Sequence, residues 1–281
     1  MAKLYYGHIE RDTVKLHYYR TGDEKQPILF LHGITDSGLC WNDTALALEP
    51  YYDVILMDAR GHGLSDKPNF GYSVEDRVND VIALLDQLNL PKLPIVGHSL
   101  GAETAALVAA RYPERVHSLI LEDPPFLKDL SRETPEAKQE RAEKFRRSIL
   151  EFSTMSHDDI IEKGRLDHPD WRESEFFQWA KAKKQVSENV INIVLEKRPF
   201  WRDYVSKITC PVLLFTGNND LGAIITPDVA EVIRSTIKQV KIVNISSAGH
   251  NIRRQNFNQF YDEVKVFIRK TSLLPPSSAS G

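Results

Sequence analysis

The stretch LPIVGHSLGA, residues 93–102, carries the pattern that most strongly indicates how this chain folds. Its first four residues are mostly apolar and are typical of a short buried strand, and the small residues that follow it are typical of a helix. Between them lies Gly97-His98-Ser99-Leu100-Gly101, which matches the pattern G-x-S-x-G. A tight turn from strand to helix projects a serine hydroxyl above a sheet and leaves little space beside it, which explains the glycines. The stretch therefore predicts Ser99 as a nucleophile on an α/β scaffold.

The first third of the chain alternates between strand-like and helix-like segments. Short apolar runs at residues 28–31, 54–57 and 116–121 resemble the run that precedes Ser99, whereas residues 14–19 alternate like an early antiparallel strand. Ser73 is placed to cap a helix that continues through residue 88. Because strands joined by helices form parallel sheets that are buried on both faces, we expect a mostly parallel central sheet covered by helices on both sides.

This alternation stops between residues 124 and 207, where the chain is highly charged and its pattern is helical. Strand-like runs resume at residues 212–215 and 240–245, and an amphipathic helix is expected over residues 257–269. The middle segment is therefore interpreted as an insertion between two halves of one sheet. Ligands bind at the carboxyl ends of the strands in such sheets, so we expect the insertion to lie over the site.

The overall composition excludes several functional classes. A net charge of -3 without an extended basic stripe argues against a nucleic-acid partner. Cys40 and Cys210 lie far apart and lack metal-ligand spacing, and two free thiols suit a reducing compartment. No secretory signal pattern and no apolar run of roughly 18 residues occurs in the sequence. We therefore expect a cytoplasmic protein that does not bind membranes, with a disordered tail over residues 272–281.

A serine hydroxyl is a weak nucleophile until a base removes its proton. His250 is the best candidate, because it follows the last expected strand through the flexible loop Ser246-Ser247-Ala248-Gly249. Such a loop can return an imidazole to the turn that carries Ser99. The other histidines lack this placement, and for His32, His62 and His98 we expect structural or packing roles.

The imidazole in turn needs a carboxylate that fixes its tautomer and stabilises its protonated form. Asp220 is favoured, because it follows the strand at 212–215 in a turn with Gly217 and two asparagines, which can direct a short side chain inward. It also gives the chain order Ser, Asp, His that accompanies this kind of serine turn. Asp123 and Glu122, at the end of an earlier strand and directly before two prolines, remain alternative acids.

The negatively charged oxygen that forms when a serine attacks a carbonyl needs backbone N–H donors. We expect one donor from Leu100, directly after the nucleophile, and a second from Ile34, in the loop after His32-Gly33. No cluster of His, Cys or Asp residues has metal-ligand spacing, and no phosphate-binding glycine loop opens a helix in the first strand–helix unit. The sequence therefore predicts neither a metal nor an organic cofactor.

Together these motifs resemble the α/β-hydrolase fold superfamily, over roughly residues 4–270. They are His32-Gly33, the run DARGHGLS at 58–65, the pentapeptide around Ser99, Gly217 with Asp220, and Gly249-His250. The resemblance implies about eight strands, with the hydrolase core at residues 1–124 and 206–271 and a helical cap at 125–205. The chain differs from the dehalogenase and soluble epoxide hydrolase branches, which place an aspartate where Ser99 stands. It also has Ile34-Thr35-Asp36 where some lipases and carbon–carbon bond hydrolases have an extended glycine run.

The expected activity is that of a serine hydrolase, which cleaves small esters or lactones through an acyl-enzyme. The expected partner is a small carbonyl compound with an apolar portion. Alternatives on the same scaffold are a haloperoxidase-like perhydrolase, a hydroxynitrile lyase, an acyltransferase, or a ligand receptor with slow turnover. Aromatic cap residues are candidates for lining an apolar pocket: Trp171, Phe176, Phe177, Trp179, Phe200 and Trp201.

Overall fold

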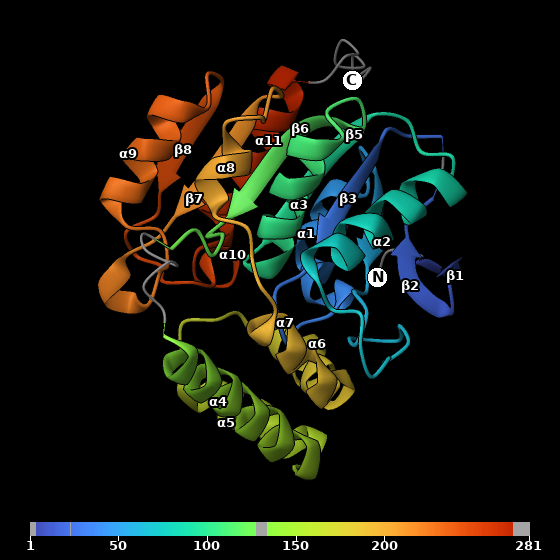
Figure 1. The fold of residues 1–281 in the computed structure, drawn as a ribbon, viewed down its shortest axis with the longest axis vertical. Coiled ribbons are helices and arrows are strands. Elements are labelled where there is room, and N and C mark those ends of the chain that lie inside the picture. Colours follow the sequence, from blue (N-terminus) through green and yellow to red (C-terminus); the bar gives the residue numbers. More distant parts are fainter. Residues whose placement is uncertain (1–3, 23, 128–133, 272–281) are drawn as a thin grey trace.

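The computed structural model describes residues 4–22, 24–127 and 134–271, and it is built around one eight-stranded sheet (Figure 1). The strand order is β1-β2-β4-β3-β5-β6-β7-β8. The strands β3 to β8 are parallel, whereas β2 pairs antiparallel with both β1 and β4. This confirms the mostly parallel sheet that the sequence predicts. The bounds are β1 Tyr5–Arg11, β2 Val14–Arg20, β3 Pro27–Leu31, β4 Asp53–Met57, β5 Leu93–His98, β6 Val116–Glu122, β7 Val212–Thr216 and β8 Val240–Asn244.

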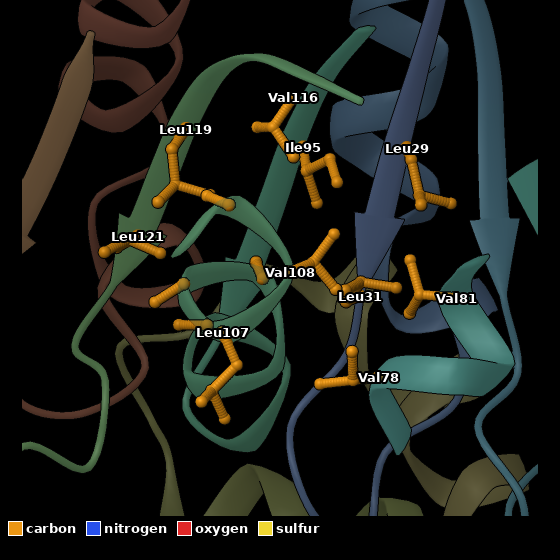
Figure 2. Close-up of a cluster of buried hydrophobic side chains, with 14 of the residues drawn as sticks. Leu29, Leu31, Val78, Val81, Ile95, Leu107, Val108, Val116, Leu119 and Leu121 are labelled. Carbon is orange, nitrogen blue, oxygen red and sulfur yellow. The ribbon is translucent and has the colours of Figure 1, made fainter. Parts of the chain in front are cut away.

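Alternate residues of the central strands face two separate apolar layers. In β3, Leu29 and Leu31 belong to the cluster with α2 (Val74–Gln87), α3 (Leu100–Arg111) and α9 (Pro227–Thr236), part of which Figure 2 shows. Ile28 and Phe30 belong to the opposite cluster, with α1 (Asn42–Leu48) and α11 (Phe257–Thr271). Burial on both faces explains why these strands read as continuous apolar runs. Helices thus cover both sides of the sheet, as expected.

The helix after β4 begins where its sequence predicts. The hydroxyl of Ser73 accepts a hydrogen bond from the backbone N–H of Asp76, and the carboxylate of Asp76 accepts one from the N–H of Ser73, both at 3.1 Å. This reciprocal cap satisfies two N–H groups that the first turn of a helix leaves unpaired. It sets the start of α2, which packs beside the helix that carries the serine turn.

The charged middle segment forms the helices α4 (Pro135–Thr154), α5 (His157–Asp167), α6 (Glu173–Gln185) and α7 (Asn192–Leu195). They gather beside the carboxyl ends of the strands (Figure 1). One small apolar cluster lies within these helices, whereas a second joins them to Tyr72 and Leu100 of the hydrolase core. The next helix, α8 (Trp201–Val205), differs from them, because Trp201, Tyr204 and Val205 pack into the α2–α3 side of the main core. By packing, the cap helices are therefore α4 to α7.

Two further findings bear on the sequence expectations. Within the described ranges, none of the helices is long and apolar enough to cross a membrane. Cys40 and Cys210 are both free and buried. The tail expected at residues 272–281 lies outside the described residues.

Candidate active site

Ser99 lies at a sharp turn between β5 and α3, and its backbone is strained. Its φ of 50° and ψ of -117° are rare for a residue with a side chain, and such a conformation costs on the order of 1–3 kcal/mol. Neither flanking glycine has room for a larger residue. A Cβ on Gly97 would lie 2.5 Å from the carbonyl oxygen of Gly101, and a Cβ on Gly101 would collide with the carbonyl oxygen of Leu31. The turn therefore has the geometry expected of a nucleophile elbow.

His250 lies in the loop between β8 and α10 (Ile252–Gln255), on the wall of the cavity that Ser99 also lines. Its Nδ1 is 2.7 Å from Oδ2 of Asp123. Because an ionised carboxylate only accepts hydrogen bonds, this contact places the proton on Nδ1 and leaves the lone pair on Nε2. The histidine therefore has the tautomer that a general base requires.

Asp123 directly follows β6, and its carboxylate is completely buried. Oδ2 also accepts a hydrogen bond from the N–H of Ile224 at 2.8 Å, and Oδ1 accepts one from the N–H of Ile225 at 3.0 Å. Its φ of 41° is another strained value, which turns the side chain toward the next strand's loop. Three hydrogen bonds thus fix this carboxylate against His250.

The preference for Asp220 as the partner of His250 is wrong in this structure. Asp220 is exposed, in a short 3-10 helix (Asn219–Leu221) whose start is capped by Asn218. The physical reason lies at Gly217, where a Cβ would approach the carbonyl oxygens of Ala248 and Gly249 to 2.5 Å. The two loops are so closely packed there that the next residues turn outward. The chain comes back toward Asp123 and His250 only at Ile224, where it presents backbone N–H groups rather than a carboxylate.

Glu122, the other alternative acid, binds Arg253 instead of His250. Its Oε2 accepts from Nη1 of Arg253 and its Oε1 from the N–H of the same residue, both at 2.8 Å. Burial raises the pKa of Glu122, and the contacts with Arg253 oppose that rise. This carboxylate anchors the start of α10 and leaves Asp123 as the acid that faces His250.

Ile34 and Leu100, the expected donors of the oxyanion hole, both line the cavity beside Ser99. The loop that carries Ile34 passes very close to the serine, since a Cβ on Gly33 would lie 3.3 Å from Cβ of Ser99. Leu100 is the first residue of α3, and the backbone N–H groups of a first helical turn point away from the helix body. The placement of both residues suits the role that the sequence predicts for them.

Two buried histidines hold the loop that carries Ile34. Nδ1 of His32 donates to the carbonyl of Gly33 at 2.8 Å, while its Nε2 accepts from the N–H of Ala59 at 3.0 Å. Nε2 of His62 accepts from the N–H of Thr35 at 3.4 Å. Burial lowers the pKa of both rings, that of His62 to about 3, so both are neutral near pH 7. They have the structural role that we expected.

His98 contacts His250 and the loop that carries it. Its Nε2 donates to the carbonyl oxygen of His250 at 3.0 Å, and the two ring centroids are 4.7 Å apart. Burial lowers the pKa of His98 well below its usual range, which keeps the ring neutral next to His250. Packing is thus only part of its contribution, because the hydrogen bond also holds the backbone of the histidine loop.

The cavity has a volume of about 630 Å³ and lies between the sheet and the cap helices. Of the six cap aromatics, Trp171 and Trp179 line it. The others do not: Phe176 packs within the cap, Phe177 is exposed, and Phe200 and Trp201 pack into the main core. Further apolar lining comes from both the cap and the core, including Leu100, Leu127, Phe145, Phe152, Ile193 and Ile224.

The cavity is also lined by the cations Lys183, Arg198 and Arg254, which the sequence patterns did not predict. Arg254 contacts Asp36 at 3.2 Å, and Lys183 lies 3.9 Å from the same carboxylate. Burial alone would raise the pKa of Asp36, but these cations hold it well below its usual range. One signal was visible in the sequence: two consecutive arginines closely follow His250.

The residues that the structure describes contain no group of three or more His, Cys, Asp or Glu side chains that is arranged to hold a metal ion.

Comparison with known proteins identifies the fold that carries this geometry. A family model described as the alpha/beta hydrolase fold matches residues 26–159. N-formylmaleamate deformylase of Pseudomonas putida is 26% identical over 266 residues, which cover 93% of this chain and 96% of that protein. 2-(Acetamidomethylene)succinate hydrolase of Mesorhizobium japonicum is 40% identical over 96 residues, and this match spans only 34% of each chain.

Solved structures agree over nearly the whole length. A crystal structure of E-2-(acetamidomethylene)succinate hydrolase gives a TM-score of 0.80 at 20% identity, and the match covers 95% of this chain and 99% of that one. Est816, described as an enzyme that degrades N-acyl homoserine lactones, gives 0.74 at 24% identity, with 93% and 100% covered. The strand order, the serine turn and these matches agree that the chain has the α/β-hydrolase fold.

Proposed function

We propose that this protein is a serine hydrolase that cleaves small esters or lactones with a triad of Ser99, His250 and Asp123. The observation that carries the proposal is the 2.7 Å contact between His250 and Asp123, on the wall of the cavity that also contains the strained Ser99. A histidine that is hydrogen-bonded to a buried carboxylate, and that shares a cavity with a serine, is the arrangement that activates the serine hydroxyl.

In the proposed reaction, Oγ of Ser99 attacks the substrate carbonyl while Nε2 of His250 takes the hydroxyl proton. Asp123 keeps the proton on Nδ1 and stabilises the imidazolium that forms. The backbone N–H groups of Ile34 and Leu100 donate to the oxygen that becomes negative in the tetrahedral intermediate. His250 then gives its proton to the leaving alcohol, and water, activated by the same histidine, releases the acyl group. Neither a metal nor an organic cofactor takes part in these steps.

The relatives support hydrolysis of a carbonyl compound and add a second candidate bond. Est816 is described as degrading a lactone, which fits the ester or lactone proposal. N-formylmaleamate deformylase, whose match covers 93% of this chain, is named for acting on an N-formyl compound, so an N-acyl bond is the second candidate. The same triad serves both, since the steps differ only in whether His250 protonates an alcohol or an amine.

Replacing Ser99 by Ala tests the proposal. With p-nitrophenyl esters, lactones and N-formyl amides as substrates, we expect kcat to fall by roughly four or more orders of magnitude, while the circular dichroism spectrum stays unchanged. Ser153→Ala, which removes an exposed hydroxyl on α4, is the matched control and should keep normal turnover. Normal hydrolysis by Ser99→Ala would show that the serine mechanism is wrong.

Burst kinetics separate an enzyme from a slowly turning receptor. An enzyme continues to release p-nitrophenol at a steady rate after the first turnover, whereas a receptor stalls after about one equivalent because the acyl group stays on the serine. We expect continued release by the wild-type protein.

A further inference from the structure

Arg198, which lines the cavity, meets two further charged side chains, one from α2 and one from α3. Nε and Nη2 of Arg198 both donate to Oε1 of Glu103, the first at 2.9 Å. Oε2 of the same glutamate accepts from Nη2 of Arg77 at 3.0 Å. Their side chains are only 14%, 2% and 4% exposed for Arg198, Glu103 and Arg77. One carboxylate is therefore shared between two nearly buried guanidinium groups.

This cluster has a net charge of +1, because its two arginines share one glutamate. A guanidinium does not lose its proton in a protein, so both arginines stay charged at any physiological pH. Burial raises the pKa of neighbouring Tyr204 well above its usual range, so its hydroxyl adds no negative charge. A buried charge without a counter-ion is costly. Arg198 is the member that lines the cavity, and its Nη1 donates to none of the residues that the structure describes.

A second group of cations near the cavity is balanced and serves as an internal comparison. Lys183 and Arg254, which line the cavity, and the buried Arg253 beside them are matched by the carboxylates of Asp36, Glu122 and Glu175. Every one of these cations has an acidic partner within the protein, so this group has little need of an external anion.

Among the residues that the structure describes, the other ionisable groups that line the cavity do not supply the missing charge at Arg198. Asp167 lies 3.3 Å from the ammonium of Lys163 on the same helix, which neutralises it. Burial lowers the pKa of His168, so the ring is neutral. The surplus charge therefore faces the cavity near Arg198.

We propose that the substrates of this cavity are carbonyl compounds that carry a free carboxylate, and that Arg198 binds it while the scissile carbonyl lies at Ser99. A planar guanidinium suits a carboxylate, because its N–H groups match the spacing of two oxygens. The apolar remainder of the cavity, with Trp171 and Trp179, would hold the carbon skeleton. This inference rests on the proposed function for the position of the reacting carbonyl, and its test is a binding measurement that needs no turnover.

The test uses the Ser99→Ala protein, which binds esters without cleaving them. Its affinities for monomethyl glutarate, an anion, and dimethyl glutarate, a neutral ester, are measured by isothermal titration calorimetry. Because hydrogen bonds to charged groups are worth about 1.5–3 kcal/mol, we expect the anion to bind roughly 10- to 100-fold more tightly. Adding Arg198→Met should bring the two affinities within about threefold of each other, since an interaction below about 0.7 kcal/mol remains.

Two further variants exclude a general effect of charge or of misfolding. Arg198→Lys keeps the charge without the planar group, so it should retain part of the preference for the anion. Arg146→Met removes an exposed cation of α4 that pairs with Glu143 and Glu188, and it should leave the preference unchanged. For each variant, both ester affinities are measured on the same protein preparation, so an inactive fraction affects both equally and does not change their ratio.

The outcomes separate this inference from the proposed function. Equal affinities for the two esters in Ser99→Ala, failure of both to bind, or a preference that survives Arg198→Met would each overturn the carboxylate site. Hydrolysis is measured separately on the wild-type protein. If the anion is preferred but neither ester is cleaved, the ester hydrolysis proposal fails and the carboxylate site stands. If both esters are cleaved but the anion is not bound more tightly, the ester hydrolysis proposal stands and the carboxylate site fails.

Discussion

The loops that follow β6 and β7 begin at neighbouring positions on the same edge of the sheet, and each contains an aspartate. After β6, Asp123 directs its buried carboxylate toward His250. After β7, Asp220 is exposed to solvent, but the same loop supplies the N–H groups of Ile224 and Ile225 to Asp123. The loop after β6 thus contributes the carboxylate, and the loop after β7 contributes the backbone N–H groups that hold it in place.

This division of roles shows that the position of an acid is set by the backbone around it. A buried carboxylate needs donors to replace the water that it loses. Asp123 receives two N–H groups and an imidazole, whereas Asp220 stays in water. The loop after β7 is therefore as necessary to the proposed triad as the loop that carries the acid.

Replacing Asp123 by Asn should have the largest effect on this comparison. The amide no longer forces the Nδ1–H tautomer of His250, and its NH2 group competes with the N–H donors of the neighbouring loop. We expect kcat for an ester substrate to fall by roughly three to four orders of magnitude. Chemical denaturation checks that the variant is folded. A loss of less than tenfold would remove Asp123 from the triad.

Replacing Glu122 by Gln should affect stability rather than chemistry, although the residue is adjacent to Asp123. The change leaves the buried guanidinium of Arg253 facing an amide, with Asp36 at 3.5 Å as its nearest remaining carboxylate. Breaking one side of a buried ion pair should lower the free energy of unfolding by about 2–4 kcal/mol. Urea denaturation measures this, and kcat per folded molecule should stay within about threefold of wild type. A collapse of kcat with unchanged stability would contradict the separation of the two carboxylates.

Replacing Asp220 by Asn should have the smallest effect. The side chain is exposed, and exposed substitutions usually change stability by less than about 0.5 kcal/mol. We therefore expect kcat and the unfolding midpoint to remain close to those of the wild-type protein, measured with the same ester and the same denaturant series. A loss of turnover comparable to that of Asp123→Asn would show that the two loops exchange roles in solution.

The parts of the fold that the sequence predicts are those fixed by local pattern. The strand before Ser99, its flanking glycines and the cap of α2 depend on residues a few positions apart. The sheet is predictable because its strands are continuous apolar runs, which indicate strands that are buried on both faces. His250 is recognisable because it is the histidine that follows the last strand.

Local sequence pattern does not predict which carboxylate faces His250 or which cation lines the cavity. Asp123 and Asp220 both follow buried parallel strands, and the contact that distinguishes them joins Ile224 to Asp123, 101 positions apart. Arg198 lies in a segment of mixed charge, and its partner Glu103 is 95 positions away. Only the folded chain shows which carboxylate is shared and which is exposed.

The most direct test of the central claim is the proton between His250 and Asp123. Proton NMR of 15N-histidine-labelled protein detects an imidazole proton that is hydrogen-bonded to a buried carboxylate as a far-downfield signal. We predict one such signal that is coupled to Nδ1 of His250 in the wild-type protein. It should persist in Asp220→Asn and disappear or move upfield in Asp123→Asn. A signal that persists in Asp123→Asn and is lost in Asp220→Asn would contradict the assignment of Asp123 as the acid.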